Sequence, residues 1–143
     1  MTFPVLSTST ETAATKRAIR VLKRLEVAQL VDHAGVFNCR TIAGSTAWSD
    51  HAFGAAADLF PRADGGDLAD KQRREIAHAL VYQSTHRTKA NRGRKLVTRY
   101  VIDHDGRAIW TPALGWHAYG GTTGNHVHGS FGPAPQGTPA CAS

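Results

Sequence analysis

Residues 49–58 read Ser-Asp-His-Ala-Phe-Gly-Ala-Ala-Ala-Asp, which has the form Ser-x-His-x-x-Gly-x-Ala-x-Asp. Its His51 and Asp58 are seven positions apart. Two such side chains converge on one ion only where the backbone approaches closely and no bulky side chain intervenes, and the residues between them are mostly small. Zinc accepts imidazole nitrogen and carboxylate oxygen, and a catalytic site needs three protein ligands and a fourth place for water. The stretch therefore predicts two of the three ligands of one zinc ion per chain.

The third ligand is expected from His126-Val127-His128 near the other end of the chain. On a strand, residues i and i+2 point to the same face, so both imidazoles can face one pocket. One of them can bind the metal while the other acts beside it. A chain with eight histidines often contains an incidental His-x-His, so the prediction depends on the longer motif at 49–58.

Together the two motifs resemble the zinc D-Ala-D-Ala carboxypeptidase family and its L-alanyl-D-glutamate peptidase relatives among phage endolysins, which share a fold with the hedgehog signalling domain. The resemblance implies that His51, Asp58 and His128 are the zinc ligands and that the substrate is the peptide part of bacterial peptidoglycan. It spans about residues 36–131. The block at 39–60 is similar to the extensin-like branch, and actinobacterial wall-hydrolase domains are similar at 100–102, 106–110, 115–116 and 125–131.

Arg40 precedes His51 by eleven residues, where this family usually carries an arginine that engages the substrate. A guanidinium makes paired, charge-assisted hydrogen bonds to a carboxylate or to the oxyanion of amide hydrolysis. We therefore expect Arg40 to act in both binding and catalysis. Further substrate-binding candidates, for which ordinary loop packing is the alternative, are Ser45, Ser49, Trp116, His117 and Tyr119.

Asn125 marks a departure from the family pattern, because many relatives have a carboxylate general base at this position. An amide cannot take up a proton. The resemblance then implies that His126 is the catalytic group, with Asp103 or Asp105 as alternatives. A neutral imidazole suits the proton transfers of peptide hydrolysis.

The hydrophobic pattern predicts an α+β domain, with helices packed on a small, mostly antiparallel sheet. One helix is expected over 9–33 and a second over 67–86, with Asp67 as its N-cap. The inward-facing residues of the second helix are expected to be Leu68, Ile76, Leu80 and Val81. Strands are expected at 36–42, 51–60, 96–103, 107–111 and 126–131, with a hairpin turn at Asp105-Gly106.

Length and composition favour a single domain over residues 1–143, with its core at about 9–132 and an irregular tail at 133–143. The chain is 41% hydrophobic and 20% charged, and it has no apolar run long enough for a membrane span. Cys39 and Cys141 belong to no Cys-x-x-Cys pair. We interpret both as non-ligands and leave open a bridge that ties down the tail.

The net charge of +6 favours a polyanionic partner. Residues 87–95 are rich in basic side chains without interleaved aromatic residues, so we expect wall attraction rather than specific nucleic-acid binding. Residues 1–15 have no basic start, apolar stretch or small-residue cleavage site, so we expect no secretory signal peptide there. We therefore expect a monomer that is made in the cytoplasm and reaches the wall after phage-type release or on a phage particle. The alternatives are a zinc-stabilised wall-binding module without peptidase activity and, less favoured, a zinc-dependent nuclease.

Overall fold

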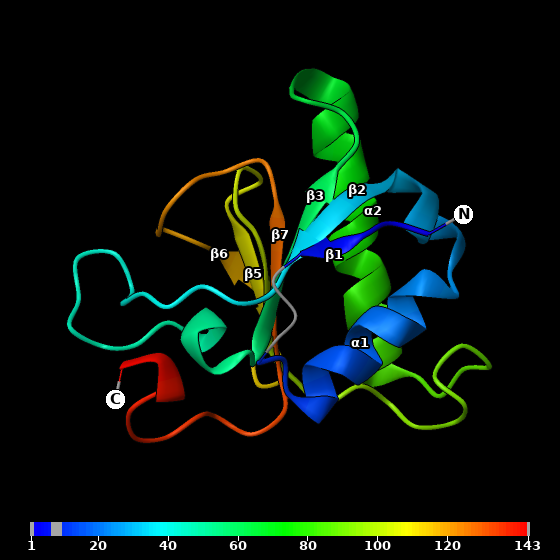
Figure 1. Ribbon diagram of the computed structural model, residues 1–143. Coiled ribbons are helices and arrows are strands. Elements are labelled where there is room, and N and C mark those ends of the chain that lie inside the picture. Colours follow the sequence, from blue (N-terminus) through cyan, green and yellow to red (C-terminus); the bar gives the residue numbers. More distant parts are fainter. Residues whose placement is uncertain (1, 7–9, 143) are drawn as a thin grey trace.

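The computed structural model describes residues 2–6 and 10–142, so the expected helix start at Ser9 and the last tail residue, Ser143, lie outside the described residues. The described part is a mixed α+β fold with a seven-stranded sheet and two α-helices (Figure 1). The helices are α1 (Ala13–Lys23) and α2 (Gly66–Thr85). The strands are β1 (Val5–Leu6), β2 (Val31–Gly35), β3 (Ala56–Pro61), β4 (Thr98–Asp103), β5 (Ala108–Thr111), β6 (Gly115–Ala118) and β7 (Val127–Phe131).

The strand order is β1-β2-β3-β7-β4-β5-β6. Only β1 and β2 pair in parallel, and all other neighbours are antiparallel. The last strand in the sequence, β7, lies between β3 and β4 in the middle of the sheet. The expectation of an α+β fold with a mostly antiparallel sheet is confirmed. The insertion of β7 brings the C-terminal histidine motif beside the strand that carries Asp58.

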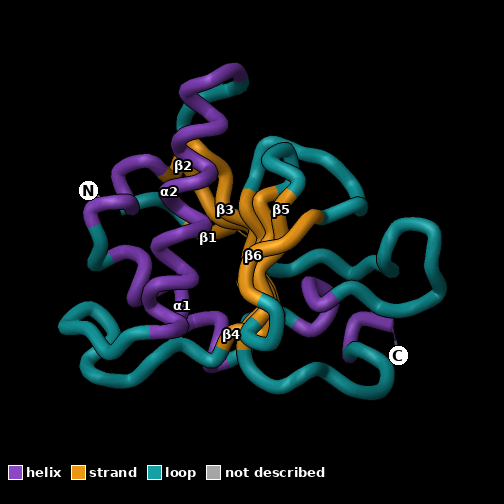
Figure 2. The backbone as a smooth tube through the Cα atoms, turned by 180° about the vertical axis from the view of Figure 1, so that it is seen from behind, coloured by secondary structure: helices purple, strands orange, loops and turns teal. Residues whose placement is uncertain are grey.

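Side chains alternate between the two faces of the central strands. In β7, Val127 and Phe131 belong to the hydrophobic core, as do Leu59 of β3 and Val101 of β4. Both helices lie on that side of the sheet, and long loops lie on the other side (Figure 2). Asp58 and His128 occupy the alternate positions, so they face the loops rather than the helices.

Helix α1 begins at an N-cap, because the Thr12 hydroxyl accepts a hydrogen bond from the Thr15 amide at 3.2 Å. Its buried stripe includes Ala18, Ile19 and Leu22. The expected helix at 9–33 is too long. The chain leaves the helix after Lys23, forms a 3-10 segment, η1 (Glu26–Leu30), and then enters β2.

Helix α2 is close to its expected length, but its N-cap is Gly65 rather than Asp67. Leu68 was expected to point inward, yet it is 60% exposed. Ile76 and Leu80 are buried as expected and Val81 is partly buried against the core, and the buried face also includes Ala69, Arg73, Ala77 and Gln83. A charged residue thus occupies the middle of the face that packs against β4.

The other predicted strands differ in detail from the structure. Residues 36–42 form no strand and contribute only an isolated bridge between Thr41 and Trp48. The hairpin between β4 and β5 is confirmed. The tail contains one short 3-10 turn, η3 (Ala140–Ala142). Across residues 2–6 and 10–142, no helix combines the length and apolar character needed to cross a bilayer.

Candidate metal centre

Asp58 and His128 face each other directly in the antiparallel pair of β3 and β7. Cross-strand partners project to the same side of a sheet, so their side chains meet on the loop face. His51 comes from a separate 3-10 segment, η2 (Asp50–Phe53), whose N-cap is the hydroxyl of Ser49. Ser49 therefore has a structural role, because it accepts a hydrogen bond from the His51 amide at 3.3 Å.

The three side chains form a nearly equilateral group. His51 Nε2 lies 3.2 Å from His128 Nδ1 and 3.2 Å from Asp58 Oδ1, and His128 Nδ1 lies 3.2 Å from the same oxygen. His51 and His128 are buried, and Asp58 is partly buried. Among the residues that the structure describes, this is the group of histidine, cysteine and acidic side chains that could hold a metal ion.

The outer nitrogen of each imidazole is already engaged. His51 Nδ1 lies 2.7 Å from the carbonyl oxygen of Val36, just beyond β2, and His128 Nε2 lies 2.7 Å from the hydroxyl of Ser130. A carbonyl only accepts, so the His51 proton is assigned to Nδ1. With His128 donating through Nε2, both inner nitrogens present lone pairs beside a carboxylate oxygen. A cation between them satisfies all three atoms, as in metal sites whose histidines are oriented by an outer acceptor.

Asp50 accepts hydrogen bonds from Arg99 and from two side chains that contact His128. Its Oδ2 accepts hydrogen bonds from Ser130 Oγ at 2.7 Å, Tyr100 Oη at 2.9 Å and Arg99 Nη1 at 2.9 Å. Burial opposes ionisation of Asp50, but these donors outweigh burial and lower its pKa. The Tyr100 ring also stacks on His128, with ring centroids 5.3 Å apart. The orientation of His128 is thus fixed through Ser130 and Asp50.

Electrostatics in the cluster favour positive charge beside Asp58. Burial would raise the pKa of Asp58, but hydrogen bonds from His128 and His51 outweigh it and hold that pKa well below its usual range. Burial would lower the pKa of His51, but the hydrogen bond and charge of Asp58 raise it. For His128, burial dominates and lowers the pKa. A proton or a metal cation next to His51 Nε2 is therefore stabilised by the same carboxylate.

A cavity of about 430 Å³ opens beside the cluster. Of the residues expected from the sequence, Arg40, Ser49, Tyr119 and His126 line it together with Asp58 and His128. Arg40 is exposed, and within the described residues its guanidinium donates to the carbonyl of Thr41, at 3.4 Å. Its guanidinium therefore remains available to a ligand in the cavity.

Three other candidates lie elsewhere. The Ser45 hydroxyl accepts from the Ala47 amide within its own loop, and Ser45 does not line the cavity. Trp116 lies against His78 and lines a neighbouring cavity of about 540 Å³. His117 is exposed, and its ring contacts the Gly115 carbonyl. The structure does not bring these side chains to the metal cluster.

His126 lies beside the cluster, with its Nε2 3.8 Å from Asp58 Oδ1. Burial lowers its pKa to about 4, so the imidazole is neutral near pH 7. Its ring packs on His104, with centroids 4.2 Å apart. His104 also lines the cavity, although it belongs to no sequence motif. It follows β4, and only the pairing of β4 with β7 brings it to His126.

The carboxylates considered as alternative bases point away from the cluster. Asp103 is 7% exposed and pairs with Arg73, whose Nε lies 2.9 Å from Asp103 Oδ1. Asp105 accepts from the Gly124 amide at 2.8 Å. Asn125 accepts from Arg73 and donates to the carbonyl of Ala63 at 2.9 Å. Position 125 is thus occupied by an amide committed to structural hydrogen bonds.

A disulfide joins Cys39 to Cys141 across 102 residues, which answers the open question of whether they pair. Cys39 immediately precedes Arg40, so the bridge attaches the C-terminal turn to the segment that carries the cavity arginine. Figure 1 shows this end of the chain next to the long loop between β2 and η2.

Replacing Gly54 with alanine is expected to destabilise the fold by about 2–3 kcal/mol, from backbone strain and overpacking. Gly54 has φ of +68°, and a Cβ there would lie 1.9 Å from the Thr10 carbonyl oxygen. Gly44 is the matched control, with φ of +74° and no atom within 4 Å of the added Cβ. Gly44→Ala is expected to cost only about 1 kcal/mol. Equal losses in urea unfolding of the two variants would contradict the role of the close approach.

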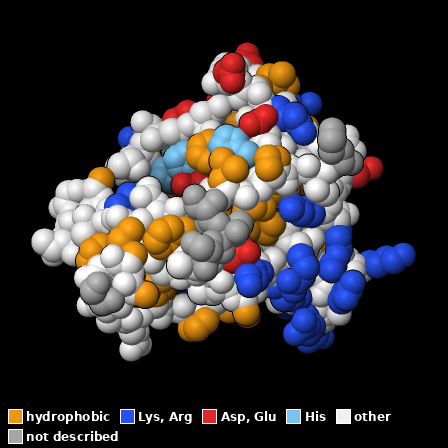
Figure 3. All heavy atoms as spheres, in the orientation of Figure 1, with side chains coloured by type: hydrophobic (Ala, Val, Ile, Leu, Met, Phe, Trp, Pro, Cys, Tyr) orange, Lys and Arg blue, Asp and Glu red, His pale blue; other side chains and the backbone are white. Residues whose placement is uncertain are grey.

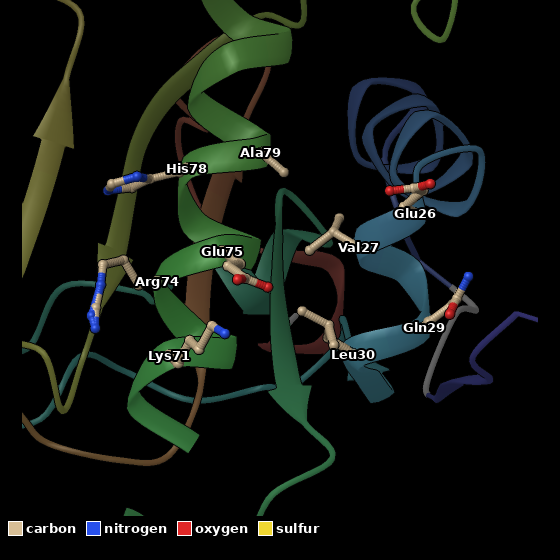
Figure 4. A pocket seen from close by; sticks show the side chains of 9 residues that line it. All are labelled: Glu26, Val27, Gln29, Leu30, Lys71, Arg74, Glu75, His78 and Ala79. Carbon is tan, nitrogen blue, oxygen red and sulfur yellow. The ribbon is translucent and has the colours of Figure 1, made fainter. Parts of the chain in front are cut away.

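A cavity of about 1050 Å³ lies between η1 and α2, and it is lined by His78 but by none of the three residues of the metal cluster. Figure 4 shows its lining, in which Val27 and Leu30 of η1 face Lys71, Glu75 and Ala79 of α2. Its charged residues are of both signs, and it does not contain the metal cluster. The candidate metal centre therefore lies beside the smaller of these two cavities.

Comparison with protein-family models, with curated proteins and with solved structures gave no significant match. The functional argument therefore depends on the geometry of the cluster and its cavity.

Proposed function

We propose that this chain is a zinc-dependent peptidase that hydrolyses stem-peptide bonds of bacterial peptidoglycan, related to the zinc D-Ala-D-Ala carboxypeptidases and endolysin peptidases and sharing their hedgehog-like fold. The observation that carries the proposal is the triangle of His51, Asp58 and His128 beside a cavity that also contains Arg40 and His126. Two imidazoles and one carboxylate with an adjacent cavity match the ligand set of catalytic zinc sites.

The spacing of the three donor atoms supports zinc as the metal. With tetrahedral angles and metal–ligand bonds of about 2.0–2.1 Å, neighbouring ligand atoms lie about 3.3–3.4 Å apart. The three atoms here are 3.2 Å from one another. Magnesium and calcium prefer more oxygen ligands than this site offers. When bound, zinc polarises a carbonyl and lowers the pKa of a coordinated water toward ~7.

Two side chains of the cavity are suited to the remaining chemistry. Arg40 can donate paired hydrogen bonds to a substrate carboxylate or to the developing oxyanion. The neutral His126 can accept a proton at Nε2, and its low pKa makes the resulting imidazolium a ready donor to the departing amine. The pKa of His126 lies below the usual value of an imidazole, because the ring is buried against His104 and Phe60.

A zinc-stabilised wall-binding module remains the second candidate. Asn125 favours it, because the position that carries a carboxylate base in many relatives is tied to Arg73 and Ala63 here. Among the described residues that line the cavity, the acidic ones are Asp50 and Asp58, and both are already engaged. The binding reading predicts retention on wall fragments without hydrolysis.

The disulfide supports action outside the reducing cytoplasm. Such bridges persist in oxidising surroundings and are rare in cytosolic proteins. Formation of the Cys39–Cys141 bond is thus expected after release to the cell surface, in line with a lysin that acts on the wall.

The test is incubation of purified wall fragments with the zinc-loaded protein, with and without a zinc chelator. New amino groups that appear only without chelator, and reappear when zinc is restored, are the expected result. Mass spectrometry of the products would then show which stem-peptide bond is cut. Retention on the fragments without new amino groups would replace the peptidase proposal with the binding module.

Ser130→Ala is expected to weaken zinc binding by about 10–100-fold, because the outer partners of metal-bound histidines contribute that much. The variant removes the link between His128 and Asp50 while leaving all three ligands in place. Ser84→Ala is the control, since this serine makes comparable hydrogen bonds to Leu80 and Thr98 away from the cluster. Titration against a competing chelator measures the affinities. Equal zinc affinity in the two variants would show that Ser130 does not orient His128.

A further inference from the structure

Two basic segments, far apart in the sequence, form one surface in the fold. Segments 13–25 and 87–97 contain no acidic residue and carry ten of the 17 lysines and arginines of the chain. The first comprises α1 and the two residues that follow it, and the second is the loop between α2 and β4. We call this surface the basic face; it consists of Lys16, Arg17, Arg20, Lys23, Arg24, Arg87, Lys89, Arg92, Arg94 and Lys95. Figure 3 shows these blue side chains gathered at the lower right of the molecule.

Direct hydrogen bonds join the two segments. The guanidinium of Arg17 donates to the carbonyls of Asn91 at 3.0 Å and Lys95 at 3.3 Å, and also to that of Arg94. Arg24 Nη1 donates to the Ala90 carbonyl at 2.7 Å. Two arginines of α1 thus hold the loop against the helix, even though this contact concentrates like charges.

The loop is also fixed from within. Asn91 is 1% exposed, its amide donates to the carbonyls of His86 and Gln83, and its Oδ1 accepts from the Thr88 amide at 2.9 Å. The Leu96 amide bonds to the Gln83 carbonyl at 2.9 Å. The basic side chains therefore extend from a rigid backbone, which reduces the entropy lost when a partner binds.

The positive charge of this surface is not neutralised within the protein. Among residues 2–6 and 10–142, none of the ten basic side chains forms an ion pair with a carboxylate. Burial and the charges of Arg94, Arg20 and Arg24 lower the pKa of Arg17, which reflects this crowding. Glu11 is an acidic neighbour, and it lines a cavity of about 320 Å³ together with Lys16, Arg20 and Lys23. Such a surface attracts a partner with repeated negative charges.

We propose that the basic face binds the phosphodiester backbone of a linear poly(polyol phosphate) attached to the bacterial wall and so holds the domain at its substrate. The choice of a wall polymer rests on the proposed function. The composition of the basic face favours contact with phosphates rather than with bases, because segments 13–25 and 87–97 contain no Phe, Tyr or Trp on which bases could stack. The exposed aromatic at its border, Tyr82, is stacked on His86 with centroids 4.0 Å apart.

Binding to such a polymer is expected to be strongly salt-dependent. Counterion release makes the logarithm of the binding constant fall with the logarithm of the salt concentration, with a slope of about −0.7 per phosphate contact for a flexible chain. About five contacts therefore predict a loss of affinity of about 100-fold between roughly 50 and 200 mM salt. The probe is poly(glycerol phosphate), labelled and titrated with the full chain by fluorescence anisotropy.

The decisive comparison uses two doubly substituted variants with equal charge. R20Q/K89Q changes one exposed residue in each segment of the basic face, and K71Q/R74Q changes two exposed residues of α2 outside it. R20Q/K89Q is expected to weaken polymer binding by about fivefold or more and to make it less dependent on salt. K71Q/R74Q is expected to weaken polymer binding by less than about twofold. Hydrolysis of small soluble muropeptides should be unchanged in R20Q/K89Q.

The outcomes separate this inference from the proposed peptidase. If the polymer binds through the basic face but no hydrolysis occurs, the proposed role of the basic face is supported and the proposed peptidase activity is rejected. If hydrolysis occurs without polymer binding, the proposed role of the basic face is wrong. It is also wrong if the two double variants lose equal affinity for the polymer. Tighter binding to single-stranded DNA than to poly(glycerol phosphate) at equal charge also overturns it, because the partner is then a nucleic acid.

Discussion

His128→Gln is expected to weaken zinc binding by more than about 100-fold, because loss of a direct ligand exceeds the 10–100-fold effect of an outer partner. His128 Nδ1 is one vertex of the triangle, and its loss leaves His51 and Asp58 as the two remaining ligands of that group. Hydrolysis of muropeptides should disappear together with the zinc. The measurements are zinc stoichiometry after dialysis and the rate at which new amino groups appear.

His78→Gln is the matched control for this variant. His78 is an exposed histidine on α2, outside the cluster, so its loss should leave zinc content and activity unchanged. Zinc at 100 times its Kd is also expected to stabilise the wild-type protein by about 2.7 kcal/mol and to have little effect on His128→Gln. A His128→Gln protein that retains one tightly bound zinc would show that the ligands have been assigned incorrectly.

Arg73→Met is expected to lower the free energy of unfolding by about 3–5 kcal/mol, because removing one partner of a buried ion pair leaves the other charge unpaired. Arg73 is 1% exposed and pairs with Asp103, which is 7% exposed. It also bonds to Asn125 and to Asp70. The loss is measured by urea unfolding at neutral pH.

Two further variants define what Arg73 contributes. Arg74→Met changes the exposed neighbour on the same helix and is expected to alter stability by no more than about 0.5 kcal/mol. The double variant R73M/D103L removes both charges and is expected to recover most of the loss, since apolar replacement of a buried pair is often nearly neutral. Equal stability of Arg73→Met and Arg74→Met would mean that the buried pair does not hold α2 against β4.

The metal cluster could be predicted from the sequence because its candidate ligands lie in two short motifs. Strand alternation sends Asp58 and His128 to one face, and the small residues at 54–57 allow His51 to approach. The expected strand at 126–131 is close to β7. These features depend on local spacing, which a single sequence displays.

Features that depend on contacts between residues far apart in the chain could not be predicted from the sequence. Arg73 lies on the buried stripe of α2 by helical period, but its partner Asp103 belongs to another element. The first helix was extended too far because the apolar pattern continues through η1 into β2. β6 is an edge strand without a buried residue, so it has no alternating pattern to detect. His104 reaches the site only through the pairing of β4 with β7, and the bonds of Asp50 to Ser130, Tyr100 and Arg99 likewise depend on distant strands.

The Cys39–Cys141 bond turns most of the chain into a covalent ring. A protease that cuts the exposed segment at 41–47 opens a backbone bond within this ring, but it releases no fragment. The nicked molecule would keep its apparent mass on a denaturing gel until a reductant is added, and its two pieces would then separate. This closure allows the domain to remain one molecule after a single cut by a protease.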